Sequence, residues 1–130
     1  MDVSLLQTHI GVELAAGVAV GPGTLVSLYS GAGASAGTLT ARLADHSDSK
    51  WAHGFALTSG SGTKTAGIAQ RVRIDRVGKV SGVDYITLSP GQTVYLGEDG
   101  KYAKTGTQKV GFAVGGNEVF VDLDLYFLAT

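Results

Sequence analysis

The segment Asp45-His46-Ser47-Asp48 brings together the three side-chain types of a Ser-His-Asp hydrolase. In such an enzyme the serine attacks the substrate, the histidine takes its proton and the aspartate orients the histidine, so the side chains must meet in a fixed order. Adjacent residues of one polar loop rarely meet in that order. The pattern therefore favours a solvated loop, and the sequence predicts no catalytic residue.

Metal ligands are the next side chains to consider. The chain has no cysteine, which excludes disulfides and thiolate sites, and its histidines are His9, His46 and His53. A zinc site needs three or four ligands on rigid elements, and these histidines show no paired spacing. His46 with Asp45 and Asp48 would hold a cation only weakly. The sequence therefore predicts no metal site and no cofactor.

A row of carboxylates lies on the last predicted strand, at Glu118, Asp122 and Asp124. Glycosidases place two carboxylates across a cleft. A row along one strand face is more typical of a solvated face or a protected sheet edge. We therefore expect these carboxylates to face solvent.

A basic strip follows another predicted strand and consists of Arg71, Arg73, Arg76 and Lys79. Nucleic-acid surfaces combine such strips with interleaved aromatic residues and a basic excess. Here Asp75 interrupts the strip, the aromatic residues lie elsewhere, and ten basic against eleven acidic side chains give a formal charge of −1. A solvated strand face is favoured, with an acidic partner as the alternative, and no nucleic-acid partner is predicted.

The elements that position these side chains are predicted to be strands. Twenty glycines argue against long helices, and β-branched and aromatic residues fill the intervals. Alternation is clearest at 68–77, where Val72 and Ile74 share one face, and at 119–127, where Val119 and Val121 share the core face and Phe120 lies opposite. Further strands are expected at 24–30, 38–44, 51–58, 85–88 and 110–114.

Turn signals separate these strands. Glu98-Asp99-Gly100 predicts a hairpin over 93–104, Ser89-Pro90-Gly91-Gln92 predicts a type II turn, and 78–83 reads as a turn region. The result is an all-β fold, a small barrel or sandwich of short antiparallel strands. Because alternation is the same in both, the pattern leaves barrel and sandwich open.

Residues 1–20 are predicted to form an extended N-terminal arm, followed by a single β domain over 21–130. The arm lies either on its own domain or on a neighbouring subunit, and its removal is expected to weaken attachment to a partner more than folding. The expected partner-contact residues are Leu5, Leu6, Ile10, Val12 and Leu14 of the arm, together with Trp51 and His53.

No segment is apolar and long enough to span a bilayer. The N-terminus has no basic region before an apolar run, which argues against a signal peptide. The sequence therefore predicts no membrane partner.

Several segments, taken in order, resemble a known family. They include Ala52-His53-Gly54-Phe55, the stretch from Leu88 to Gly97 that reads Leu-Ser-Pro-Gly-Gln-Thr-Val-Tyr-Leu-Gly, and the closing Glu118-Val119-Phe120-Val121-Asp122. Across roughly residues 20–125 the chain resembles the capsid decoration (cement) proteins and head-fibre domains of tailed bacteriophages.

The resemblance implies a structural role in the virion. Such proteins bind the outer surface of the major capsid protein shell, often as homotrimers, stabilise it, and carry no catalytic residues. It implies a protein that is made in the host cytoplasm and located on the capsid surface. The alternative is a receptor-binding or carbohydrate-binding β domain of the virion.

Overall fold

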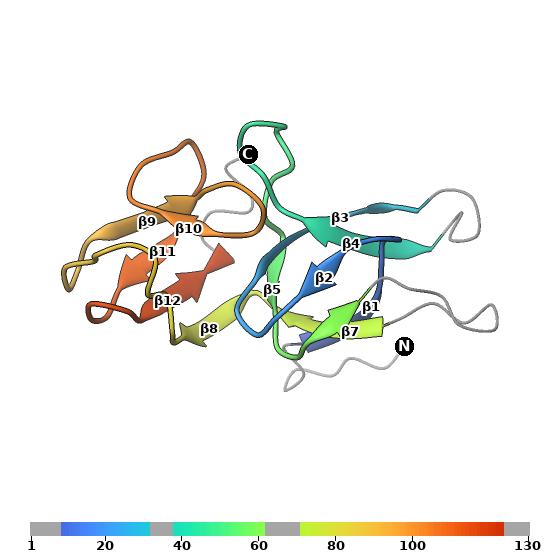
Figure 1. Cartoon of the computed structure of the whole chain (residues 1–130), viewed down its shortest axis with the longest axis horizontal. Coiled ribbons are helices and arrows are strands. Elements are labelled where there is room, and N and C mark those ends of the chain that lie inside the picture. Colours follow the sequence, from blue (N-terminus) through green and yellow to red (C-terminus); the bar gives the residue numbers. More distant parts are fainter. Residues whose placement is uncertain (1–8, 32–37, 62–70, 124–130) are drawn as a thin grey trace, which may run out of the picture.

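The computed structural model describes residues 9–31, 38–61 and 71–123. As the sequence predicts, the fold is all-β. It combines a closed five-stranded barrel, a second five-stranded sheet and a small two-stranded sheet. In Figure 1 the barrel lies on the right and the second sheet on the left. The expected alternatives, barrel or sandwich, are thus resolved into a barrel joined to a sheet.

The barrel has the strand order β1-β4-β3-β5-β7, with β7 pairing back to β1. Its strands are β1 His9–Leu14, β3 Leu25–Ser30, β4 Leu39–Leu43, β5 Gly54–Ala56 and β7 Arg71–Asp75. All pairs are antiparallel except β1 with β4, where Glu13 aligns with Thr40. The first strand therefore closes the barrel by joining two strands far from it in sequence.

Alternate residues of the barrel strands point inward and form one core. Its members are Val12, Leu14, Val20, Val26, Ala41, Ala56, Val72 and Ile74. Val12 and Leu14 are each 1 % exposed. This corrects the expectation of an arm over 1–20 with Val12 and Leu14 free for a partner: residues 9–14 are a barrel strand, because closing the barrel buries their apolar face. Residues 1–8, with Leu5 and Leu6, lie outside the described residues.

The second sheet has the order β10-β9-β11-β12-β8. Its strands are β8 Val77–Val80, β9 Thr93–Leu96, β10 Tyr102–Ala103, β11 Lys109–Ala113 and β12 Val119–Asp122, while β2 Ala19–Val20 and β6 Gly60–Ser61 pair separately. The chain passes from the barrel to this sheet at Arg76, between β7 and β8. The inner face of the sheet carries residues such as Val94, Val110, Val119 and Val121, each fully buried.

The barrel and the second sheet share this second core. Leu25 of β3 and Phe55 of β5 turn away from the barrel interior and pack with the sheet residues. Gln108, just before β11, reaches back to the segment before β5, where its side chain accepts from the Ala52 N–H and donates to the Ala52 carbonyl at 2.8 and 2.9 Å. Apolar packing and these paired hydrogen bonds thus join the two halves.

Several of the predicted local elements are confirmed by the structure. The hairpin over 93–104 is confirmed, with Asp99 and Gly100 both at positive φ, as a type I′ turn requires. The alternation at 71–75 and 119–122 is also confirmed; residues 124–127 of the predicted last strand lie outside the described residues.

Two local predictions are wrong. Residues 78–80, predicted as part of the turn region 78–83, belong to strand β8, because they pair with β12. Residues 85–88, predicted as a strand, form none; the Tyr85 hydroxyl accepts a hydrogen bond from the Tyr102 N–H. Among the described residues no helix is long and apolar enough to cross a membrane.

Candidate functional site

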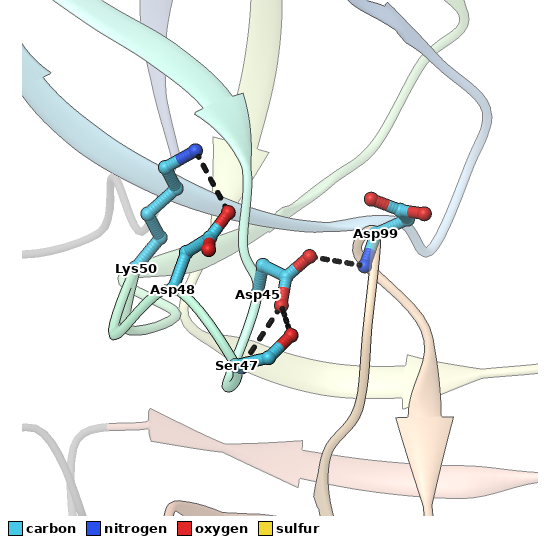
Figure 2. Close-up of polar contacts among 5 residues, drawn as sticks. All are labelled: Asp45, Ser47, Asp48, Lys50 and Asp99. Carbon is cyan, nitrogen blue, oxygen red and sulfur yellow. Dashed lines mark hydrogen bonds and ion pairs between the residues drawn. The ribbon is translucent and has the colours of Figure 1, made fainter.

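The loop at 45–50 is held by hydrogen bonds and an ion pair of its own side chains, as Figure 2 shows. Asp45 Oδ1 accepts from the Ser47 N–H at 2.9 Å and from the Ser47 hydroxyl at 2.6 Å. Its Oδ2 accepts from the Asp99 N–H at 3.4 Å. Because the serine hydroxyl donates to the aspartate directly, no histidine stands between them as the triad order requires.

The electrostatics of this loop agree with a structural role. The hydrogen bond from the Ser47 hydroxyl, supported by backbone N–H groups, lowers the pKa of the Asp45 carboxyl. Asp48 pairs with Lys50 at 3.4 Å, with the two side chains 63 % and 37 % exposed. A lowered pKa keeps Asp45 ionised as an acceptor, so the loop is a fixed, charged turn that sets the path of the chain between β4 and β5.

Three side chains of the predicted charged rows have a partner in the structure, and Asp124 lies outside the described residues. Lys79 pairs with Glu118 at 3.3 Å, and the Arg71 guanidinium donates to the Gly11 carbonyl at 3.0 Å. Within the described parts of the chain, no three histidine or carboxylate side chains lie close enough to hold a metal ion. These charges therefore stabilise the outside of the strands that carry them.

His53 is half-buried and has a defined tautomer. Its Nδ1 accepts from the Leu28 N–H at 2.8 Å, so that nitrogen carries no proton in the folded protein. Burial, with the nearby Arg42 charge as a second cause, lowers the pKa of His53. His53 thus ties the segment before β5 to β3 as a neutral imidazole.

This arrangement predicts an acid-dependent loss of stability. The unfolded chain takes up a proton on His53 below about pH 6.5, whereas the folded chain resists it. The contribution is therefore fully present above pH 6.5 and is lost as the pH falls from there through the folded-state pKa. Urea unfolding followed between pH 7.5 and 5 should show this slope.

An asparagine at His53 provides an acceptor that does not titrate. His53→Asn should flatten the slope relative to the wild-type chain. An unchanged slope in His53→Asn would contradict this assignment.

The remaining predicted contact residues differ in accessibility. Ile10 is 46 % exposed on β1 and is available for a partner. Trp51 is partly buried and packs against the second core, and His53 is occupied by the Leu28 N–H.

The most prominent exposed apolar surface was missed by the sequence analysis. Phe112 of β11 and Phe120 of β12 are register partners on the outer face of the second sheet. Their rings stack with centroids 5.4 Å apart. Phe112 and Val114, two residues apart on the same face, are 46 % and 42 % exposed. We call Phe112, Val114 and Phe120 the aromatic patch; the alternation that placed Phe120 opposite Val119 and Val121 was its only signal.

A second feature lies at the β10 edge of the same sheet. The Tyr85 hydroxyl accepts a hydrogen bond from the Tyr102 N–H at 2.8 Å, on the side of β10 that has no neighbouring strand. Tyr85 thereby satisfies a backbone N–H that would otherwise be free to pair with another strand. A partner is therefore more readily bound by the face of this sheet than by its β10 edge.

Comparison with protein-family models, with curated proteins and with solved structures finds no match for this chain.

Proposed function

We propose that this chain is a structural protein of a bacteriophage virion, which binds the outer surface of the capsid shell and stabilises it. The observation that supports the proposal best is the aromatic patch, in which Phe112 is 46 % exposed and stacks on the half-buried Phe120. Buried aromatic residues contribute most of the energy in many interfaces. The sequence resemblance to decoration proteins supplies the identity of the partner, the major capsid protein.

The aromatic patch lies on strands whose opposite face is packed in the core, which suits a contact surface. Val110, Val119 and Val121, on the opposite face of the same strands, are fully buried, so the phenylalanine rings stand on a packed core. A contact surface that is ordered before binding loses little conformational entropy on association. The Lys79–Glu118 pair at 3.3 Å beside the patch supplies a polar rim.

Binding to the shell would stabilise it through the coupling between binding and assembly. A protein that binds the assembled shell and not its free subunits shifts the equilibrium towards assembly. The same resemblance leads us to propose a homotrimer, in which the linkage of three copies would raise the effective concentration of each further contact. Its sedimentation-equilibrium mass should be three times that of one chain.

The direct test is binding to capsid shells that lack the chain. The purified chain should co-sediment with such shells and raise the temperature at which they disrupt. Failure to co-sediment, at a chain concentration well above that of the shell subunits, would contradict the proposal.

Phe112→Ser should weaken shell binding by at least about tenfold, which corresponds to about 1.4 kcal/mol. The fold should tolerate the change, since the cross-strand pair with Phe120 contributes only about 0.5–1 kcal/mol. Co-sedimentation isotherms and thermal melts of the same preparations measure the two effects separately.

Leu57→Ser is the matched control, because Leu57 is also an exposed apolar residue, at 38 %, but lies next to barrel strand β5. It should leave shell binding unchanged. Equal losses in the two variants would show that the aromatic patch has no special part in the contact.

A further inference from the structure

Two surface hollows meet at Tyr85, away from the aromatic patch. Their volumes are about 270 and 420 Å³, and both are lined by Tyr85, Asp99 and Lys101. His46, Glu98 and Thr105 also line the larger hollow. Small-molecule sites typically measure about 300–1,000 Å³, so the larger hollow has room for one ring-sized ligand and the smaller one for its substituents.

Tyr85 is exposed but held in one orientation. The residue is 48 % exposed, while its hydroxyl accepts the Tyr102 N–H at 2.8 Å. Lys101 Nζ lies 5.7 Å from the centre of the ring. Partial burial raises the pKa of Tyr85 above its ordinary value near 10, so the hydroxyl is neutral at pH 7. The ring is therefore a preorganised contact surface, and binding a ligand on it loses little side-chain entropy.

The groups around the ring decide the class of ligand. The larger hollow is lined by two acidic residues, Glu98 and Asp99, and by the basic Lys101, so neither an anionic nor a cationic ligand would meet charges of one sign only. An apolar ligand would leave these polar groups desolvated and unpaired. A ligand with many hydroxyl groups and one apolar face satisfies all of them, because hydroxyls pair with carboxylate and ammonium while C–H groups pack on the aromatic ring.

We propose that the Tyr85 surface binds a neutral pyranose sugar, stacked on the Tyr85 ring with its hydroxyls on Asp99, Glu98 and Lys101. This function goes beyond shell attachment and uses different residues. A virion protein with such a site would attach the particle to glycans at the host surface. Because the hollows are open and the ligand is small, affinity for a single sugar is expected near the millimolar range.

Nuclear magnetic resonance of the whole chain tests the site without any substitution. Methyl pyranosides of glucose, galactose, mannose and N-acetylglucosamine are titrated in turn, with uncharged myo-inositol as the non-pyranose control. At least one pyranoside should shift the amide signals of Tyr102 and Lys101, because the first amide is bonded to the Tyr85 hydroxyl. Absence of shifts with every sugar, shifts confined to other regions, or an equal response to inositol would each overturn the proposal.

Substitutions identify the ring as the contact. Tyr85→Ala should weaken the responding sugar by more than about tenfold, and Tyr85→Phe, which keeps the ring, by less than about threefold. Tyr95→Ala, a tyrosine of β9 that lines neither hollow, should leave sugar binding unchanged. Sugar binding that survives in a folded Tyr85→Ala would overturn the assignment. Shell co-sedimentation of Tyr85→Ala should remain normal, so failure of this site is distinguishable from failure of the shell contact.

Discussion

Replacing Gln108 by leucine should lower the free energy of unfolding by about 4 kcal/mol. Gln108 is 5 % exposed and Ala52 is fully buried. The glutamine amide satisfies both the N–H and the carbonyl of Ala52, at 2.8 and 2.9 Å. Leucine keeps the apolar part of the side chain but leaves two buried backbone groups unpaired, and each such group costs about 1–3 kcal/mol. Urea unfolding at pH 7.5 measures the loss.

Gln92→Leu is the matched control. The Gln92 side chain also accepts a backbone hydrogen bond, from the Ser89 N–H at 3.0 Å, but in an exposed turn. Water replaces that bond when it is lost, so the expected cost is below about 1 kcal/mol. If both substitutions cost the same, the pairing of Gln108 with Ala52 does not join the barrel to the second sheet as the geometry indicates.

Gln108 also illustrates what the sequence does not reveal. It follows Gly106 and Thr107 in a polar stretch that reads as a loop, and its partner Ala52 lies 56 positions away. A side chain that completes the hydrogen bonds of a distant segment leaves no local pattern. The same holds for β1, whose neighbours β4 and β7 are distant in the chain, so residues 9–14 could be predicted as extended but not as part of a closed barrel.

Features set by neighbouring residues were predictable. Asp99-Gly100 specifies its hairpin because both residues adopt positive φ, which glycine and aspartate tolerate. The alternation of Val72 and Ile74 with charged residues identified the core face of β7. The two surfaces proposed as contacts were harder to find, since Phe112 and Tyr85 look like core residues until the sheet shows which face is covered.

Gly100→Ala is expected to destabilise the protein by about 3 kcal/mol, because two costs add at this position. Its φ of 75° costs an alanine about 1 kcal/mol or more. In addition, a Cβ there would lie 2.6 Å from Thr24 Cγ2 and 2.8 Å from the Leu25 carbonyl oxygen. Relieving such a contact by shifting packed groups costs about 1–3 kcal/mol. Urea unfolding beside the wild-type chain gives the total.

Gly91→Ala separates the two costs. Gly91 has a similar φ of 85°, but nothing lies within 4 Å of the position a Cβ would take, so only the backbone cost of about 1 kcal/mol remains. The difference between the two losses of unfolding free energy measures the steric cost of placing a Cβ between the hairpin tip and the barrel. Equal losses would mean that the tip can move away freely.

A tip displaced by Gly100→Ala should also change the Tyr85 surface. Gly100 donates to the Ala44 carbonyl at 2.7 Å and accepts from the Leu25 N–H at 2.9 Å, and these two bonds fix the turn that carries Asp99 and Lys101. Moving the turn moves both polar groups relative to the Tyr85 ring. Gly100→Ala should therefore weaken pyranoside binding in the fraction of protein that stays folded, whereas Gly91→Ala should not. If Gly100→Ala instead binds the sugar normally, the turn is not what positions the polar groups of that surface.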